Sequence, residues 1–304
     1  MNPPEQPTAR QLAQQLDAVG YITDDHLAAT LHLMTVLEKP LLLEGEAGVG
    51  KTEIAKCLAL ALNTPLIRLQ CYEGLDAHQA LYDWDYQRQL LAIQMMASQK
   101  TEDTASALKA NVYDEEYLLK RPLLRAITSP QPAVLLIDEI DRADEEFEAF
   151  LLELLSDFQI TIPELGTITA SSKPRVILTS NGVRDLSDAL RRRCLFHYID
   201  FPDRVRELSI IRRRLPDIDE RLATQIVTFM QNLRRQQLRK TPGVAESLDW
   251  AASLMNLQIR DLTQSLDSID ITLSCIAKTQ DDIKLISSQR EDYTDMLDVF
   301  SNRG

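Results

Sequence analysis

An eight-residue run near the start of the chain combines glycines, a lysine and a threonine at a spacing that suits phosphate binding. The run Gly45-Glu46-Ala47-Gly48-Val49-Gly50-Lys51-Thr52 matches the pattern G-x-x-x-x-G-K-[ST] at every fixed position. Glycines let successive backbone N–H groups point inward around an anion, at the positive end of a helix. The same pattern places the Lys51 ammonium near the β- and γ-phosphates and the Thr52 hydroxyl near Mg²⁺. The run therefore predicts a site for a nucleoside triphosphate with Mg²⁺.

Two adjacent carboxylates, Asp138 and Glu139, follow the apolar run Ala133–Ile137. Phosphoryl transfer to water needs one carboxylate near Mg²⁺ and a second group that orients the attacking water. Asp138 fits the first role and Glu139 the second. An acidic pair is also common at the start of a helix, where negative charge is favoured. The glycine-rich run upstream favours the catalytic interpretation.

Short apolar runs predict the strands that position these groups. Each run is bounded by residues that break regular structure, and helical patterns separate one run from the next. This alternation is typical of an α/β fold with a buried parallel sheet and crossover helices. The expected strands are Leu41–Leu43, Leu66–Leu69, Ala133–Ile137 and Val176–Leu178.

Helical periodicity is clearest over Asp144–Phe158, where apolar side chains recur every three or four residues. Two earlier helices are expected over Asp24–Glu38 and Glu53–Leu62, and alternating residues predict a β-hairpin over Gln159–Ala170. Strand signals fade beyond Pro202, and the rest of the chain is expected to be helical. The later helices are predicted over Arg204–Leu215, Asp219–Leu238, Glu246–Asp261 and, less regularly, Leu262–Phe300. We therefore expect a flexible N-terminal segment over 1–20, an α/β nucleotide-binding core over 21–202 and a helical region over 203–304.

The composition excludes several classes of protein. A net charge of −13 argues against binding nucleic acid mainly through phosphate neutralisation. No apolar run approaches the length of a membrane span, and the N-terminus lacks a secretory signal pattern. The four cysteines and four histidines are scattered, without the close spacing of zinc ligands. Reduced cysteines in a cytoplasmic protein are the simplest interpretation.

Together, these motifs resemble those of the AAA+ ATPases, and specifically the MoxR family, over residues 20–260. The resemblance implies the fold class: an α/β core with a three-layer P-loop parallel sheet, followed by a smaller all-α lid domain. It implies that ATP and Mg²⁺ bind at Gly45–Thr52, with Thr52 and Asp138 as the metal-binding residues. It also implies hydrolysis of ATP to ADP and phosphate, with Glu139 polarising the water.

Two further segments resemble functional motifs of that family. Val176–Asn181 looks like the sensor-1 strand, in which Asn181 hydrogen-bonds the attacking water or the γ-phosphate. Asp188–Cys194 resembles the segment that supplies an arginine finger to the neighbouring subunit, with Arg193 the best match and Arg192 the next. Asn181 with the following glycine is also a common turn, and clustered arginines are often only a solvated surface.

Two insertions complete the resemblance. The predicted hairpin at Gln159–Ala170 corresponds to the family's pre-sensor-1 insertion, and the insert in the second helix would lie in Gly74–Gln99, around Trp84–Tyr86. These aromatic residues are equally compatible with a core role. The family often has a sensor-2 arginine at the start of a lid helix, but no arginine lies between Arg239 and Arg260. Either Arg239 or Lys240 substitutes for it, or the contact is missing.

The resemblance implies a homo-oligomeric ring, a hexamer, that remodels a protein client in the cytoplasm. Proteins similar to MoxR act with partners that carry a von Willebrand factor A domain, in chaperone-like maturation of a metalloenzyme or complex. Acid-rich Asp138–Asp157 and base-rich Arg184–Lys240 would suit head-to-tail association. Three alternatives stay open: a Rubisco-activating member of the same branch, a DNA-associated AAA+ motor that uses Arg204–Lys240, and a scaffold that binds ATP without hydrolysing it.

Overall fold

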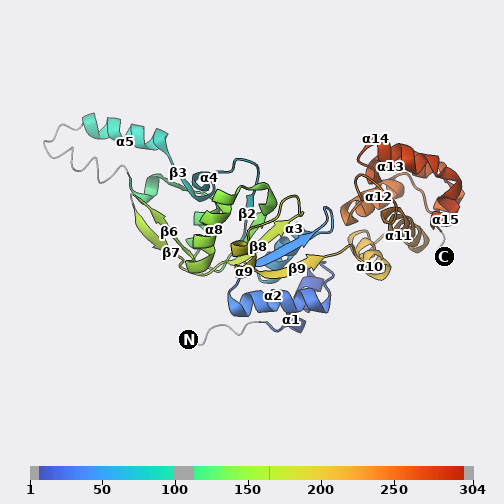
Figure 1. Ribbon diagram of the computed structural model, residues 1–304, viewed down its shortest axis with the longest axis horizontal. Helices are drawn as coiled ribbons and strands as arrows, with labels where there is room; N and C mark the ends of the chain where they lie inside the picture. The colour runs from blue at the N-terminus through green and yellow to red at the C-terminus, as the bar shows by residue number, and fades with distance from the viewer. Residues whose placement is uncertain (1–6, 99–112, 164, 298–304) are drawn as a thin grey trace. The chain divides into compact units, whose positions relative to one another are not determined.

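The computed structural model describes residues 7–98, 113–163 and 165–297 (Figure 1). The chain divides into two compact units, each assembled from segments that are separate in the sequence. The first, here called the sheet unit, comprises Met1–Gln15, Asp25–Glu44 and Ala55–His197. The second, here called the helical unit, comprises Leu16–Asp24, Gly45–Ile54 and Tyr198–Gly304. The glycine-rich run thus groups with the C-terminal helices.

A five-stranded sheet forms the centre of the sheet unit, with strand order β2-β5-β8-β1-β9. The strands are β1 (Leu41–Gly45), β2 (Leu66–Gln70), β5 (Val134–Asp138), β8 (Arg175–Ser180) and β9 (Leu195–Ile199). The pairs β2–β5, β5–β8 and β8–β1 are parallel. Their carboxyl ends therefore lie at one edge of the sheet, where β5 ends in Asp138 and β1 continues into the glycine-rich run.

Apolar residues bury both faces of the three central strands, β1, β5 and β8. Leu42, Leu135 and Leu178 share one hydrophobic cluster with residues of α7 (Pro122–Ile127) and α8 (Glu145–Asp157). The intervening residues, which point to the opposite face, are buried as well. Uniformly apolar strands are expected where helices cover both sides of a parallel sheet.

Helix α8 shows how local sequence sets the ends of an element. The Asp144 side chain accepts a hydrogen bond of 2.8 Å from the Phe147 N–H and so caps the first turn. The helix ends at Phe158, which adopts a left-handed conformation and leads directly into strand β6 (Gln159–Ile162). Strand β6 pairs antiparallel with β7 (Gly166–Thr169).

A second small sheet carries the predicted helix insertion. Strand β3 (Tyr82–Trp84) pairs antiparallel with β4 (Leu118–Lys120), and α5 (Tyr86–Ser98) follows β3 and extends away from the main sheet (Figure 1). Trp84 is buried, whereas Tyr86 is exposed. Three further described α-helices lie wholly within this unit: α2 (Asp25–Leu37), α4 (Ala77–Leu81) and α9 (Asp188–Arg193).

The helical unit has its own hydrophobic core. Phe229 lies with its ring centroid 5.2 Å from that of Trp250 and 5.7 Å from that of Tyr293. The buried pair Arg234–Glu207, at 2.7 Å, joins α10 to α11 beside this core. The helices are α10 (Arg204–Arg214), α11 (Glu220–Arg234), α12 (Val244–Asn256), α13 (Asp267–Ile276), α14 (Gln280–Ser288) and α15 (Tyr293–Leu297).

The structure confirms the predicted α/β fold with a helical C-terminal region, including the four predicted strands and the hairpin. The structure differs from the prediction at the N-terminus, where the sequence predicts a flexible segment over 1–20. Residues Ala9–Ala18 form helix α1, because Leu12 and Leu16 are buried on one side of it. Strand β9 and the β3–β4 sheet are not predicted by the sequence. Helix α3 (Lys51–Ala61) begins two residues earlier than expected.

The expected segments include residues outside the described ranges at four places: 1–6, 99–112, Glu164 and 298–304. Among the residues that are described, no helix combines the length and apolar character needed to cross a membrane.

Candidate functional site

The glycine-rich run forms a loop that connects β1 to α3. Gly48 and Gly50 have φ angles of +81° and +99°, which residues with side chains rarely adopt. The Lys51 ammonium donates hydrogen bonds of 2.7 Å to the carbonyl oxygens of Gly45 and Glu46. Lys51 therefore folds back over the loop that precedes it, which is the position from which an ammonium can meet a bound phosphate.

Close backbone approaches require glycine at two places around this loop. A Cβ at Gly45 would lie 2.3 Å from the carbonyl oxygen of Ile199. A Cβ at Gly243, the residue before α12, would lie 2.7 Å from backbone atoms of Gly48. The Val244 N–H also donates to the Gly48 carbonyl oxygen at 3.0 Å. The start of α12 thus packs directly on the phosphate loop.

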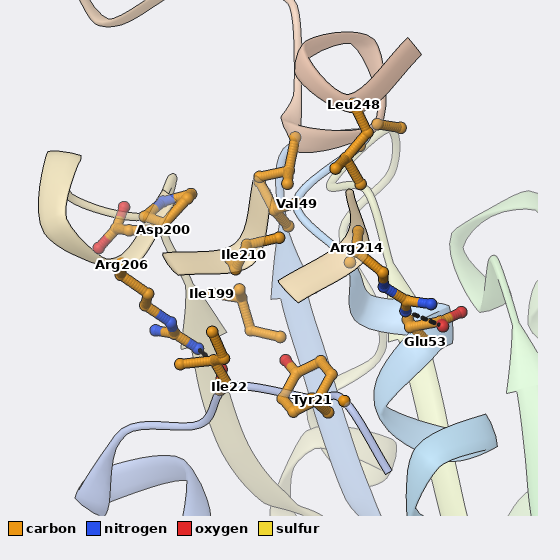
Figure 2. Close-up of a pocket in the computed structure, with 16 residues that line it drawn as sticks. Tyr21, Ile22, Val49, Glu53, Ile199, Asp200, Arg206, Ile210, Arg214 and Leu248 are labelled. Atoms are coloured by element: carbon orange, nitrogen blue, oxygen red, sulfur yellow. Dashed lines mark hydrogen bonds and ion pairs between the residues drawn. The ribbon is translucent and has the colours of Figure 1, made fainter. Parts of the chain in front are cut away.

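A cavity of about 260 Å³ lies beside the loop, and all its lining residues belong to the helical unit (Figure 2). Tyr21, Ile22, Val49, Ile199 and Leu248 give it mainly apolar walls. Apolar walls with a few polar groups are the usual lining of a small-molecule site. Its size and its position beside Val49 suit the base of a nucleotide.

Two arginines of α10 face the same cavity. The Arg206 guanidinium bonds to the Ile22 carbonyl oxygen at 3.1 Å and to the Asp24 carboxylate at 2.8 Å. Arg214 forms an ion pair with Glu53, in the first turn of α3 (Figure 2). Each guanidinium is therefore held by an acidic partner within the helical unit.

Asp138 ends β5 in the sheet unit, with only 2% of its surface exposed. Its Oδ1 accepts a hydrogen bond from the Thr179 hydroxyl at 2.6 Å, and its Oδ2 pairs with Arg68 at 2.6 Å. A buried carboxylate needs such partners, because burial penalises its charge. Its oxygen donors and its place at the carboxyl edge of the sheet fit a Mg²⁺ ligand.

Glu139 adopts a left-handed conformation with φ +56°. Its N–H donates to Thr179 Oγ1 at 2.9 Å, while its Oε2 accepts from Gln70 at 3.1 Å and pairs with Arg142 at 2.7 Å. The conformation turns the chain sharply after β5, so that the two carboxylates are held by different partners. Residues in sparsely populated backbone regions concentrate at functional sites.

Asn181 follows β8, the strand beside β5. Its backbone N–H donates to Asp141 Oδ2 at 3.1 Å, and the same oxygen accepts from the Val183 N–H at 2.9 Å. Asn181 therefore follows the strand next to the one that ends in Asp138, and Asp141 links it to the turn that contains Glu139.

The arginines of α9 occupy three different environments. Arg191 pairs with Glu44 at 2.9 Å, next to the start of the loop. Arg193 donates to Ser156 Oγ at 2.9 Å and remains exposed, as does Arg192. Arg192 and Arg193 are thus on the surface, where a neighbouring molecule can reach them.

Two places could supply the sensor-2 arginine that the sequence lacks: Arg239 and the start of α12. Arg239 pairs with Asp281 at 2.9 Å, and its backbone N–H bonds to Asp282. At the start of α12, the position closest to the loop is Gly243, where a side chain would collide with Gly48. Arg239 therefore has a partner of its own, and the start of α12 leaves no space for an arginine at Gly243.

Local sequence patterns do not point to four residues that contact the carboxylates, namely Arg68, Gln70, Arg142 and Thr179. Arg68 and Gln70 are polar residues on the exposed face of the edge strand β2, where they resemble ordinary surface residues. Register could have suggested Gln70, because it lies directly opposite Asp138 in the β2–β5 ladder.

The acidic cluster also influences a buried thiol. The Cys71 N–H donates to the Asp138 carbonyl oxygen at 2.9 Å. Burial, together with the negative charges of Asp138, Asp141 and Glu139, raises the pKa of the Cys71 thiol to about 12. The thiol is therefore neutral near pH 7 and unsuited to act as a nucleophile.

The sheet order, the phosphate loop and the carboxylate pair define a P-loop ATPase of the AAA class. The chain belongs to the AAA domain family, dynein-related subfamily, whose model matches residues 40–194. This domain indicates a nucleotide-hydrolysing ATPase, and AAA+ proteins generally assemble into rings.

Two relatives and one solved structure extend the comparison. The chain is 24% identical over 253 residues to a gas vesicle ATPase, GvpN, of Haloferax mediterranei, covering 80% of this chain and 70% of that protein. It is 28% identical over 228 residues to an uncharacterized protein of Staphylococcus aureus, covering 73% and 77%. A RuvB variant of Thermotoga maritima has a similar fold, with a TM-score of 0.50 and 20% identity over 89% of this chain and 75% of that one.

Proposed function

We propose that this protein binds ATP with Mg²⁺ at the Gly45–Thr52 loop and hydrolyses it to ADP and phosphate. The observation that carries the proposal is the Lys51 ammonium, which is held over its own loop by two carbonyl oxygens. The adjacent apolar cavity suits the adenine base. Membership of an ATPase family supports the same reaction.

In the proposed reaction, the loop N–H groups and Lys51 bind the phosphates. Thr52 and Asp138 would hold Mg²⁺, which neutralises charge on the phosphate oxygens when it is bound. Glu139 accepts a hydrogen bond from the attacking water, and Asn181 orients that water. Apolar walls around Val49 exclude solvent from the base.

Nucleotide binding and phosphate release test this proposal directly. Lys51→Ala should weaken ATP binding by at least 100-fold in a calorimetric titration, because the loop loses its ammonium. Lys39→Ala, at an exposed lysine outside the loop, is the matched control and should bind ATP as the wild type does. Equal ATP affinity for Lys51→Ala and the wild type would remove the loop from the mechanism.

We further propose that hydrolysis requires a ring, most simply a hexamer, in which Arg193 or Arg192 reaches the ATP of the neighbouring subunit. Both arginines lie on the surface at the end of α9. A planar guanidinium that is always charged suits the charge that develops on the γ-phosphate. An arginine supplied in this way contributes roughly 10³–10⁵ in rate in other ATPases and GTPases.

Dilution distinguishes a ring from an active monomer. The rate of phosphate release per subunit should fall steeply once light scattering shows only monomers. Arg193→Ala and Arg192→Ala, compared at a concentration that keeps the assembly intact, identify the residue that acts across the interface. If monomers hydrolyse ATP as fast as assemblies, no arginine acts in trans.

We also propose that the protein belongs to the MoxR branch and remodels a protein client, acting with a partner that contains a von Willebrand factor A domain. The motif order and the similarity to a gas vesicle ATPase support this placement. A Rubisco-activating role is the alternative within the branch. Affinity capture with the Glu139→Gln variant and ATP, compared with capture without ATP, tests whether a von Willebrand factor A protein or Rubisco is retained.

A further inference from the structure

One threonine hydroxyl contacts both residues of the predicted catalytic pair, the carboxylate of Asp138 and the backbone N–H of Glu139. Thr179 Oγ1 donates to Asp138 Oδ1 at 2.6 Å and accepts a hydrogen bond of 2.9 Å from the Glu139 N–H. Its donor and one of its acceptor positions are therefore both used on neighbouring residues of one turn. Thr179 itself lies in β8, the strand beside β5.

A second contact links the same two segments, this time through a side chain that follows β5. Asp141, which follows the carboxylate pair, accepts hydrogen bonds from the N–H groups of Asn181 and Val183. Together, the two Thr179 bonds and the two Asp141 bonds form what we call the β5–β8 bracket. The β5 side of this bracket contains Glu139 and the β8 side contains Asn181.

The two side chains that form these bonds are buried. Thr179 is 1% exposed and Asp141 is 3% exposed. Water therefore cannot replace either partner, and a lost bond would leave a buried polar group unsatisfied. Both anchors lie within the sheet unit, as do all the groups that they hold.

The β5–β8 bracket holds Glu139 in a left-handed backbone conformation. A left-handed conformation is unfavourable for a residue with a side chain and persists only where its surroundings fix it. The N–H of this residue bonds to Thr179. Without the hydroxyl, the backbone N–H of Glu139 loses its acceptor, one of the contacts that oppose relaxation of this residue.

We propose that Thr179 is a positioning residue for ATP hydrolysis, which sets the carboxylate of Glu139, and that Asp141 does the same for Asn181. The inference rests on the proposed ATP hydrolysis. Thr179 acts through Glu139 and does not touch the nucleotide. A displacement of about 1 Å in a catalytic group can cost about 10²-fold in rate. Loss of the bracket should therefore lower kcat and leave nucleotide binding nearly unchanged.

Steady-state kinetics of the full chain compare Thr179→Val with Thr179→Ser. Valine has nearly the shape of threonine but lacks the hydroxyl, whereas serine retains it. We expect kcat to fall 10- to 100-fold for valine, KM to stay within about twofold, and serine to recover most of the rate. Thr35→Val is the matched control, because Thr35 is a buried threonine of α2 whose hydroxyl donates to Leu31 at 3.0 Å. Equal kcat values for Thr179→Val and Thr35→Val would overturn the proposal.

A double-mutant cycle separates positioning of Glu139 from general damage. In a Glu139→Gln background the carboxylate is already absent, so Thr179→Val should lower the residual rate by less than about threefold. If the two losses instead multiply, Thr179 does not act through Glu139 and the proposal is wrong.

Hydrogen exchange gives a readout that does not depend on hydrolysis. The peptide that contains Glu139 should exchange at least tenfold faster in Thr179→Val than in Thr179→Ser or Thr35→Val, because its N–H has lost its acceptor. Unchanged exchange would overturn the bracket even if the rate falls. A wild type that releases no phosphate would contradict the proposed function, whereas the exchange result still decides whether Thr179 holds Glu139.

Discussion

In the phosphate loop, Lys51 bonds to carbonyl oxygens five and six residues before it. The carboxylate turn after β5 is held differently, by Thr179 and Arg68, which lie 40 and 70 positions from the groups they contact. The loop therefore takes its shape mainly from its own residue types. The turn takes its shape from neighbouring strands, so changes far away in sequence should disturb it.

The largest effect on ATP binding is expected at Gly45, where the loop approaches the backbone of a residue that is distant in the sequence. Gly45→Ala would place a Cβ 2.3 Å from the Ile199 carbonyl oxygen, which cannot move as a side chain would. We expect ATP binding to weaken by at least 100-fold and stability to fall by about 3 kcal/mol. Calorimetric titration and thermal unfolding measure the two effects. Gly74→Ala, with φ +79° and open space around it, should cost only about 1 kcal/mol and leave binding unchanged; equal effects of the two changes would contradict the steric argument.

A smaller effect is expected at the contact between α12 and the loop. Gly243→Ala would bring a Cβ to 2.7 Å from Gly48, but the start of a helix can shift more easily than a central strand. We expect ATP affinity to fall by about tenfold, or about 1.4 kcal/mol. Fluorescence titration with a labelled ATP analogue provides the measurement. An affinity equal to that of the wild type would mean that α12 does not restrain the loop.

At the carboxylate turn, Arg68→Ala should raise the affinity for Mg²⁺, whereas the two glycine substitutions lower the affinity for ATP. In the proposed site, Arg68 would compete with Mg²⁺ for Asp138, and as a half-exposed partner it contributes on the order of 1 kcal/mol. The Mg²⁺ concentration that supports half-maximal phosphate release should therefore fall by about fivefold. Arg68→Lys retains the positive charge and should remain close to the wild type. A higher Mg²⁺ requirement in Arg68→Ala would mean that Arg68 supports the metal site.

The smallest effect concerns pH. The pKa of the Cys71 thiol is raised to about 12 in the folded protein, whereas a thiol in the unfolded chain ionises near pH 8.5. The neutral thiol therefore contributes fully to the free energy of unfolding below about pH 8.5, and this contribution is lost as the pH rises toward the pKa of the folded protein. Between pH 7 and pH 9 the wild type should lose about 0.8 kcal/mol relative to Cys71→Ala. Denaturant unfolding at the two pH values tests this, and parallel curves for the two proteins would be inconsistent with it.

The sequence predicts the loop and the central strands because their signals are local. Eight consecutive residues specify the phosphate loop, and uniformly apolar runs mark β1, β5 and β8. By contrast, β9 alternates exposed and partly buried residues at the edge of the sheet, so it lacks the uniformly apolar pattern that marks the central strands. The sequence predicts a flexible segment where α1 forms, because the segment is mostly polar and only its two leucines become buried.

The carboxylates could be identified from the sequence, but their partners could not. Asp138 and Glu139 end an apolar strand, which is a visible pattern. The roles of Thr179 and Arg68 depend on which strands become neighbours and on the register between them. The positive φ of Glu139 has no local signal either, because glutamate has no preference for that conformation.

A single-turnover measurement with radiolabelled ATP tests most directly whether the loop binds ATP and Glu139 promotes its hydrolysis. Wild type and Glu139→Gln are compared at concentrations that saturate the loop with nucleotide. We predict that both bind ATP with affinities within about threefold of each other and that the variant forms ADP at least 100-fold more slowly, since the water loses its proton acceptor. Conversion at the same rate in both proteins, or no ATP binding by the wild type, would contradict the account.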